Sequence, residues 1–215
     1  MGFGFKVEIR GKYACFSRPE LKVERVSYDV LTPGAARGIL EAVMWKPAIR
    51  YVIDEIAVCA PIKFENIRRN EVAFKANGFA PRSATEDRQQ RAAIVLKDVR
   101  YIVTAHFKMT DRAGENDNEQ KFAEMIRRRL GKGQQFHAPY LGTREFPAAL
   151  RLLDDGDMPA PIAETRTLGL MLYDMEYVTE TDAAGGIVVK GFRPTYFFAE
   201  MTNGVIDLRN PGVLR

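Results

Sequence analysis

The highest density of side chains that could do chemistry lies in one short stretch, GKGQQFHAPYLGTREF, from Gly131 to Phe146. Lys132 and Arg144 could neutralise phosphates there, and the rings of Phe136 and Tyr140 could stack on bases. Glycine lets a backbone pass close to a ligand and expose its N–H groups. The glycines of this predicted loop are Gly131, Gly133 and Gly142. The residue types favour a loop that binds nucleic acid, and the alternative is a helix terminator followed by an ordinary loop.

Several other chemistries lack their motifs. The stretch has neither the GxxxxGK[ST] order of a Walker loop nor a Rossmann fingerprint, and no GxSxG elbow of a serine hydrolase occurs anywhere. The two histidines, His106 and His137, have no HxxxH spacing and no DxD-like companion. We therefore predict neither a metal nor another cofactor. His106 lies within an alternating segment, which favours a core position or a partner on the sheet surface over a direct functional role.

Metal-free acid–base chemistry on RNA remains open. Cleavage by the 2′-hydroxyl needs a group that takes its proton, a cation that stabilises the phosphorane, and in-line geometry. Histidine, lysine and tyrosine can supply the first two roles. Lys121, Lys132, His137 and Tyr140 are close together in the sequence, although spacing alone does not show that they converge.

Composition and charge describe an ordinary globular protein with a mildly basic balance. The 215 residues are 46% hydrophobic and 28% charged, with a formal net charge of +4. Cys15 and Cys59 have no CxxC spacing and indicate free thiols in a reducing compartment. The chain begins with a strand pattern, and no apolar run approaches the ~18 residues of a membrane span. We expect a soluble cytoplasmic protein without membrane contact.

The elements that must position these side chains follow from hydrophobic periodicity. Phe5 to Phe16 alternates as a strand, and a helix begins at Thr32-Pro33, where Thr32 can cap it, and ends before Pro47. A second helix, capped by Asn116 or Asp117, runs to Leu130, and Gly131 is placed to terminate it. The expected strands are Arg50 to Ile67, bent at Pro61, then Ile94 to Met109, and Arg144 to Leu153, with an irregular insertion over residues 70–90.

This order of elements predicts an α+β protein whose first 153 residues form a βαββαβ ferredoxin-like domain. From residue 154 to 215 the pattern is mostly strands, which predicts a small antiparallel β domain. Asn203-Gly204 is a strong signal for a two-residue hairpin turn. The strands expected in this second part are Leu168 to Val178, Ile187 to Lys190, Tyr196 to Met201 and Val205 to Leu208.

Several segments carry a resemblance to a known family. The chain is similar over nearly its full length to the CRISPR-associated Cas-five family, in its subtype I-C (Dvulg) branch. TPGAARGILEAVMWKP is the most specific segment, within SYDVLTPGAARGILEAVMWKPAIRYVIDEI. The others, in the expected order, are GFGFKVEIRGKYACFSRPE, CAPIKFENIRRNEV, LKDVRYIVTAHF, NDNEQKF and YLGTREF. The resemblance implies a RAMP-type fold: a ferredoxin-like domain with a glycine-rich loop, plus a small C-terminal β domain.

The resemblance also implies a function and a site. In type I-C systems this subunit resembles the enzyme that cuts precursor CRISPR RNA at the base of the repeat hairpin without metal. It then keeps the 5′ handle of the crRNA within the Cascade surveillance complex, alongside other Cas subunits. Relatives place a tyrosine before the Trp of WKP and a Lys-His pair early in the second helix. This chain has Met44 before Trp45 and Lys121-Phe122, so only the lysine transfers.

Two explanations follow from that incomplete match. Either His137, with Tyr140 as second choice, supplies proton transfer from the adjacent loop while Lys121 stabilises the transition state, or the chain mainly binds RNA as a scaffold. A third reading is a binder or nuclease acting on DNA. We predict RNA contacts from Arg37, Lys46, Lys132 and Arg144. For the single Trp45, a core position is favoured over a stacking surface.

Overall fold

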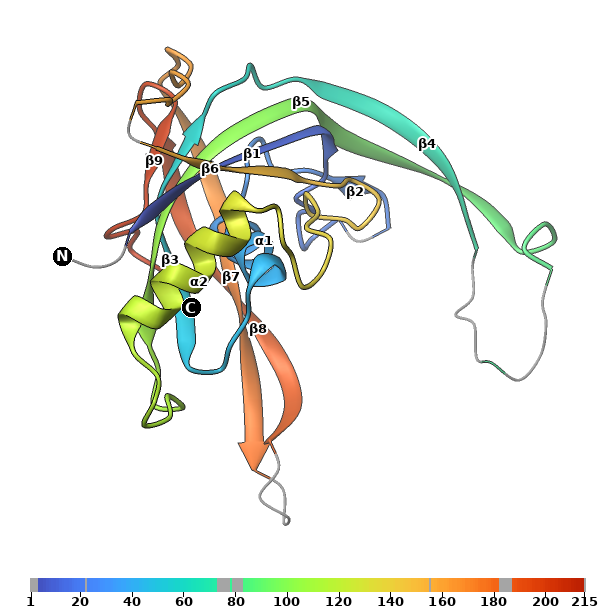
Figure 1. Ribbon diagram of the computed structural model, residues 1–215. Coiled ribbons are helices and arrows are strands. Elements are labelled where there is room, and N and C mark those ends of the chain that lie inside the picture. Colours follow the sequence, from blue (N-terminus) through green and yellow to red (C-terminus); the bar gives the residue numbers. More distant parts are fainter. Residues whose placement is uncertain are drawn as a thin grey trace.

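The computed structural model describes residues 4–21, 23–72, 78, 83–154, 156–181 and 187–214. Its main sheet has the order β6-β1-β5-β3-β9 (Figure 1). The strands are β1 (Phe5–Ala14), β3 (Ile49–Val58), β5 (Arg88–Met109), β6 (Ala149–Leu153) and β9 (Val205–Asp207). α1 (Pro33–Val43) lies between β1 and β3 in the chain, and α2 (Glu119–Gly131) lies between β5 and β6. These two helices and the strands β1, β3, β5 and β6 form the predicted ferredoxin-like βαββαβ unit.

The longest strand, β5, joins the body of the sheet to a projecting two-stranded arm (Figure 1). Its second half lies between β1 and β3, while its first half pairs with β4 (Phe64–Val72). The short β2 (Arg25–Val26) runs parallel to it at Ala93 and Ile94. Because β3 and β4 pair with different halves of β5, the prediction of one bent strand from Arg50 to Ile67 is wrong.

The prediction of an irregular insertion over residues 70–90 is wrong at both ends of that range. β4 continues to Val72 and β5 begins at Arg88, because these two ends pair with each other as neighbouring antiparallel strands. Residues 73–77 and 79–82 lie outside the described residues. The arm is therefore a regular ladder where its pairing can be followed.

The two helices begin and end where local hydrogen bonding dictates. Thr32 caps α1 as predicted, its hydroxyl accepting from the Ala35 N–H at 3.3 Å. The cap of α2 is Asn118, whose extended backbone lets its side chain accept from the Lys121 N–H, and the prediction of Asn116 or Asp117 is wrong.

The end of α2 also differs from expectation. Gly131 is still helical, and the left-handed residue is Gly133, with a φ of 64°. The N–H groups of Gly133 and Gln134 return to the carbonyls of Leu130 and Arg129, which is the Schellman arrangement. A second glycine was therefore needed to turn the chain toward the loop.

The largest core lies between the helices and one face of the sheet. Side chains of a strand alternate between faces, so Val7 and Ile9 of β1 are fully buried there. A much smaller apolar cluster of Ala57, Ile102 and Leu153 lies on the opposite face. Glu8, between Val7 and Ile9, points to that second face.

The C-terminal part contributes a two-stranded sheet of β7 (Arg166–Thr181) and β8 (Ile187–Met201). The two predicted strands Ile187 to Lys190 and Tyr196 to Met201 are thus one continuous strand, paired with β7 throughout its length. The chain then turns at Asn203-Gly204, both with positive φ, as predicted, and β9 pairs with β3 in the main sheet. The division into residues 1–153 and 154–215 stays a prediction.

Two sequence expectations concern the whole chain. Cys15 and Cys59 are free cysteines, Cys15 buried and Cys59 half-buried. Within the described ranges, neither helix has the length and apolar character that crossing a bilayer would require.

Candidate nucleic-acid groove

A groove with a volume of about 780 Å³ lies between α1 and the segment that follows α2. It gathers aromatic, basic and proton-transferring side chains on one surface. Its lining residues are Gly38, Glu41, Ala42, Trp45, Phe136, His137, Ala138, Tyr140 and Arg144. The structure therefore brings together three predicted site residues, His137, Tyr140 and Arg144, in one place.

The loop is fixed to the last turn of α1 by its own backbone. The N–H groups of Phe136 and His137 both donate to the carbonyl of Ala42, at 2.9 and 3.0 Å. Carbonyls in the last turn of a helix have no partner within the helix, so this one is free to accept them. The ring centroids of Phe136 and His137 lie 4.3 Å apart in an edge arrangement. The imidazole is consequently held beside an aromatic surface at the groove.

Three aromatic side chains at this groove are exposed, with 57% of Trp45, 66% of Phe136 and 39% of Tyr140 accessible. The prediction of a core position for Trp45 is wrong. α1 ends at Val43, and Met44 is extended, so Met44 and Trp45 point to opposite sides. Met44 takes the buried side, where the hydroxyl of Tyr51 donates to its carbonyl at 2.9 Å.

The C-terminal end of the loop is hydrogen-bonded to the residue that follows β1. Leu141 is fully buried, its carbonyl accepts from the Cys15 N–H at 3.0 Å, and its N–H donates to Phe146. Gly142 follows with a φ of 85°, and a β-carbon there would collide with the carbonyl of Cys15. Tyr140 and Arg144 flank this anchor with exposed side chains. A side chain at position 142 would thus be excluded by both the backbone conformation and the collision.

The two positions at which the family resemblance implies catalytic side chains are part of the core in this chain. Met44 is 1% exposed and Phe122 is 2% exposed. The Phe122 ring meets the ring of Phe107 at 6.5 Å, edge to face. Neither side chain reaches the surface of the groove, so proton transfer there would have to come from other residues.

Two lysines gather near the start of α2. The ammonium of Lys121 lies 2.9 Å from Asp117 Oδ1 and 3.3 Å from the carbonyl of Asn116. Hydrogen bonds from Lys121 and the Gly114 N–H lower the pKa of Asp117, and the charge of Lys46 lowers it further. Lys121 is thus paired with Asp117, and the charge of Lys46 acts on the same carboxylate.

A second groove, of about 540 Å³, begins on the other side of Trp45. Its basic lining residues are Arg37, Lys46, Arg50 and Arg112. Trp45 and Glu41 border both grooves, so the two form one path across the C-terminal end of α1. Sequence reasoning did not single out Arg50 or Arg112, because neither lies near a recognisable motif.

Arg37 is bound to two carboxylates. It contacts Asp174 through Nε and Nη2 and Glu41 through Nη1. Burial alone would lower the pKa of Arg37, but the hydrogen bond and charge of Asp174 raise it above its ordinary value. Its contact with RNA stays a prediction, and the geometry instead gives it the role of holding β7 against α1.

The remaining predicted residues lie apart from the groove surface. Lys132 is exposed at the end of α2 and lines neither groove. His106 bonds to Asp54 through Nδ1 at 2.8 Å, which agrees with one of its two predicted positions, beside a partner on the sheet surface. Among the described residues, no three His, Cys, Asp or Glu side chains are grouped as metal ligands would be.

The sheet order, the two helices and the glycine-containing loop define a ferredoxin-like protein of the RAMP type. Residues 4–209 match the family described as CRISPR-associated protein (Cas_Cas5), in its Cas5d form, and the chain belongs to this family. The predicted membership of the subtype I-C branch is confirmed.

Two relatives are similar over almost their whole length. A protein of Mannheimia succiniciproducens, named CRISPR pre-crRNA endoribonuclease Cas5d, is 48% identical over 222 residues, covering 94% of this chain and 93% of the relative. A Thermus thermophilus protein of the same name is 43% identical, covering 94% and 90%. A solved structure from Streptococcus mutans, functionally uncharacterized, has a TM-score of 0.70 at 21% identity and covers 99% and 97%. This last likeness supports the fold alone.

Proposed function

We propose that this chain cuts precursor CRISPR RNA within its repeat and then remains on the crRNA as a subunit of a surveillance complex. The similarity to two named pre-crRNA endoribonucleases supports the activity. The observation in the structure that supports it is the groove, which exposed Trp45, Phe136 and Tyr140 line together with His137. Stacking rings beside a proton-transferring group suit RNA with unpaired bases. Its RNA substrate and its free thiols fit a cytoplasmic location.

The chemistry proposed for the groove uses no metal. His137 takes the proton of the attacking 2′-hydroxyl, and the 2′-oxygen bonds to phosphorus as the bond between phosphorus and the 5′-oxygen breaks. The departing 5′-oxygen takes a proton from water. The products carry a 2′,3′-cyclic phosphate and a 5′-hydroxyl. Lys121 stabilises the charge on the phosphorane, and Tyr140 is the second candidate for proton transfer. Arg144 and Lys46 hold phosphates at the two grooves, and Lys132, at the end of α2, contacts the RNA beyond them.

Burial of Met44 and Phe122 supports one alternative, a scaffold that binds the repeat and cuts poorly. In that case the grooves still hold RNA through stacking and phosphate contacts, and other Cas subunits assemble on it. Tight repeat binding without detectable product would favour this reading. The DNA alternative is tested by competition between repeat RNA and DNA of the same sequence.

The decisive experiment is cleavage of the repeat RNA encoded beside the gene, in buffer with EDTA. We expect one cut in the repeat with a cyclic phosphate at the new 3′ end, and no cut when the 2′-hydroxyl at that position is replaced by hydrogen. Activity that disappears in EDTA and returns with Mg²⁺ would contradict the mechanism. A DNA version of the repeat is the matched control.

A further inference from the structure

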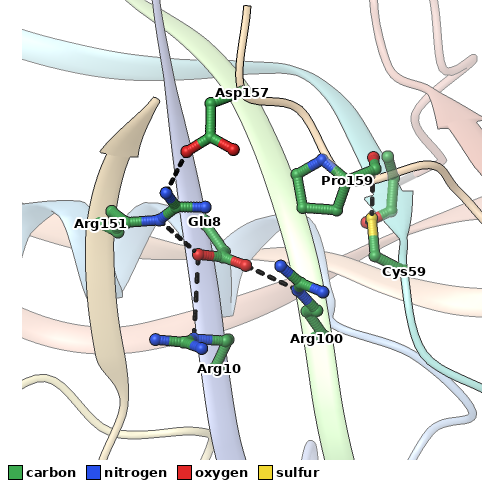
Figure 2. Close-up of polar contacts among 8 residues, drawn as sticks. Glu8, Arg10, Cys59, Arg100, Arg151, Asp157 and Pro159 are labelled. Carbon is green, nitrogen blue, oxygen red and sulfur yellow. Dashed lines mark hydrogen bonds and ion pairs between the residues drawn. The ribbon is translucent and has the colours of Figure 1, made fainter. Parts of the chain in front are cut away.

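A buried carboxylate lies on the face of the sheet opposite the helices. The side chain of Glu8, in the middle of β1, is only 1% exposed (Figure 2). Taking an unpaired carboxylate out of water is costly, so a buried one requires compensating donors. Figure 2 shows that arginines from neighbouring strands supply them.

Three arginines surround Glu8, each with its Nε atom directed at the carboxylate. Arg100 of β5 donates to Oε1 at 2.6 Å, Arg151 of β6 donates to Oε2 at 2.8 Å, and Arg10 Nε lies 3.8 Å from Oε2 (Figure 2). Burial tends to raise the pKa of Glu8, but the hydrogen bonds from Arg151 and Arg100 outweigh it, and the pKa lies below its ordinary value. The carboxylate therefore stays charged and orients the guanidinium groups.

The three arginines carry more positive charge than the single carboxylate of Glu8 can neutralise. Arg10 and Arg100 are directly opposite each other on adjacent strands, an arrangement that destabilises a sheet when the charges are alike. The side chains of Arg10, Arg100 and Arg151 remain 55%, 38% and 42% exposed. Among the described residues, none accepts a hydrogen bond from the Nη atoms of Arg10 or Arg100. Exposed arginine donors without a protein acceptor are suited to binding an anion.

A carboxylate of the protein already occupies part of this site. Asp157, with a side chain that is 69% exposed, bonds to Nη1 of Arg151 (Figure 2). Because Asp157 lies on an exposed segment, an incoming anion could take its place at low cost. With Glu8 and Asp157 counted against three arginines, the cluster still has a net charge of +1.

We propose that Arg10, Arg100 and Arg151 form a second phosphate site, which binds a backbone phosphate of the RNA on the face of the sheet opposite the groove. The non-bridging oxygens of a phosphate match the paired N–H donors of an arginine fork. RNA is favoured over an acidic peptide because the ligand proposed for this protein presents one phosphate per nucleotide. The inference rests on the proposed function, since the phosphate belongs to the same RNA.

This site is separate from the catalytic groove. Arg10 follows Ile9, and side chains of adjacent strand residues point to opposite faces. Ile9 is buried on the helix side, where α1 lines the groove, so Arg10 points away from it. A defect at the second site should therefore weaken RNA binding and leave the chemical step intact.

The test is repeat-RNA binding by Arg10→Gln across a series of salt concentrations. Arg10 makes the longest contact with Glu8, so this variant should fold, which circular dichroism can check. We expect binding to weaken roughly three- to tenfold and the slope of log K against log salt to fall by about 0.7–0.9. A scrambled RNA of equal length should lose as much affinity, because phosphate contacts do not read sequence. The cleavage rate at saturating RNA should not change.

Three further variants complete the design. Arg100→Gln should repeat the loss, and Asp157→Asn should tighten binding, because it removes the competing carboxylate. Arg209→Gln is the control, since Arg209 is exposed and carboxylate-paired like Arg151 but lies after β9. Unchanged affinity and salt slope in both Arg10→Gln and Arg100→Gln would overturn the second site and leave the proposed function standing. Absence of RNA binding by the wild-type chain would overturn both.

Discussion

The guanidinium group of Arg37 on α1 holds both carboxylate oxygens of Asp174 on β7, with Nε–Oδ2 at 2.9 Å and Nη2–Oδ1 at 2.8 Å. Both side chains are largely buried, at 21% and 14% exposed. The pair joins residues that are 137 positions apart in the chain. It is a polar link between the first helix and the C-terminal hairpin.

Replacing Arg37 should therefore affect stability more than RNA binding. Arg37→Ala leaves Asp174 with little compensation, and we expect a loss of about 2–3 kcal/mol in the free energy of unfolding. Urea denaturation measures it. The double variant Arg37→Ala/Asp174→Ala should lose less free energy of unfolding than the two single variants together, because either single change already removes the same contact. A stable Arg37→Ala variant with weakened RNA binding would show instead that Arg37 contacts the RNA.

Trp45 should be important for RNA and nearly neutral for folding. Because its ring is exposed where the two grooves meet, Trp45→Ala should weaken repeat binding by about 1–3 kcal/mol, the range of one stacked base. Trp45→Phe should recover most of that loss. Phe198→Ala is the matched control, since Phe198 is 68% exposed on β8 and lines neither groove. Equal effects of the two alanine variants would refute a stacking role.

Cleavage should depend on His137 and Lys121. His137→Ala removes the proposed base, and we expect the rate at saturating RNA to fall by about 10²-fold or more, with affinity little changed. Lys121→Ala should slow the same step by about tenfold or more. Lys190→Ala, on the exposed hairpin and paired with Glu180, provides the control. Wild-type rates in both variants would mean that the groove uses other residues.

Gly133 and Gly142 allow a comparison of two left-handed glycines. Gly133→Ala adds a methyl group to open space and should cost about 1–2 kcal/mol, the conformational penalty alone. Gly142→Ala should cost clearly more, because its β-carbon would collide with the Cys15 carbonyl. Thermal unfolding measures both. Equal losses would indicate that the loop can move away from β1.

The low pKa of Glu8 gives the stability of the fold a defined pH dependence. A carboxylate whose pKa is lower in the folded state stabilises the fold above its unfolded pKa, here 4.5, and that stabilisation is lost as pH falls through the folded value. Glu8→Gln should therefore destabilise the protein at pH 7, and the difference from wild type should shrink below about pH 4.5. Urea denaturation of both proteins at pH 7 and at a pH well below 4.5 tests this. An equal difference in the free energy of unfolding at both pH values would contradict it.

Patterns that are local in the sequence predicted the fold well. Alternation and helical spacing identified the βαββαβ order, because each element must bury one face. Thr32 and Asn203-Gly204 were recognisable because caps and tight turns depend on a few adjacent residues. The residues that cap and end α2 were misplaced by one or two positions, since several neighbouring polar residues and glycines could fill each role.

The site was harder to predict because its geometry depends on contacts between distant segments. Trp45 is apolar and close to a helix, yet one extended residue, Met44, decides which way it faces. Arg37 was predicted as an RNA contact, and its pairing with Asp174 was missed because Asp174 lies on a strand near the other end of the chain. Burial of Glu8 likewise follows from arginines on three strands. The loop around His137 was found because its residues are contiguous.

The length of β5 has an evolutionary consequence. Residues 101–105 are paired with β1 on one side and β3 on the other, and the same strand continues into the arm beside β4. Deleting or inserting one residue in this shared section would exchange the inner and outer faces of everything beyond it. Such changes would disturb the body and the arm together. Gene variation among members of the family should therefore alter the length of β5 far less often than that of the surface loops.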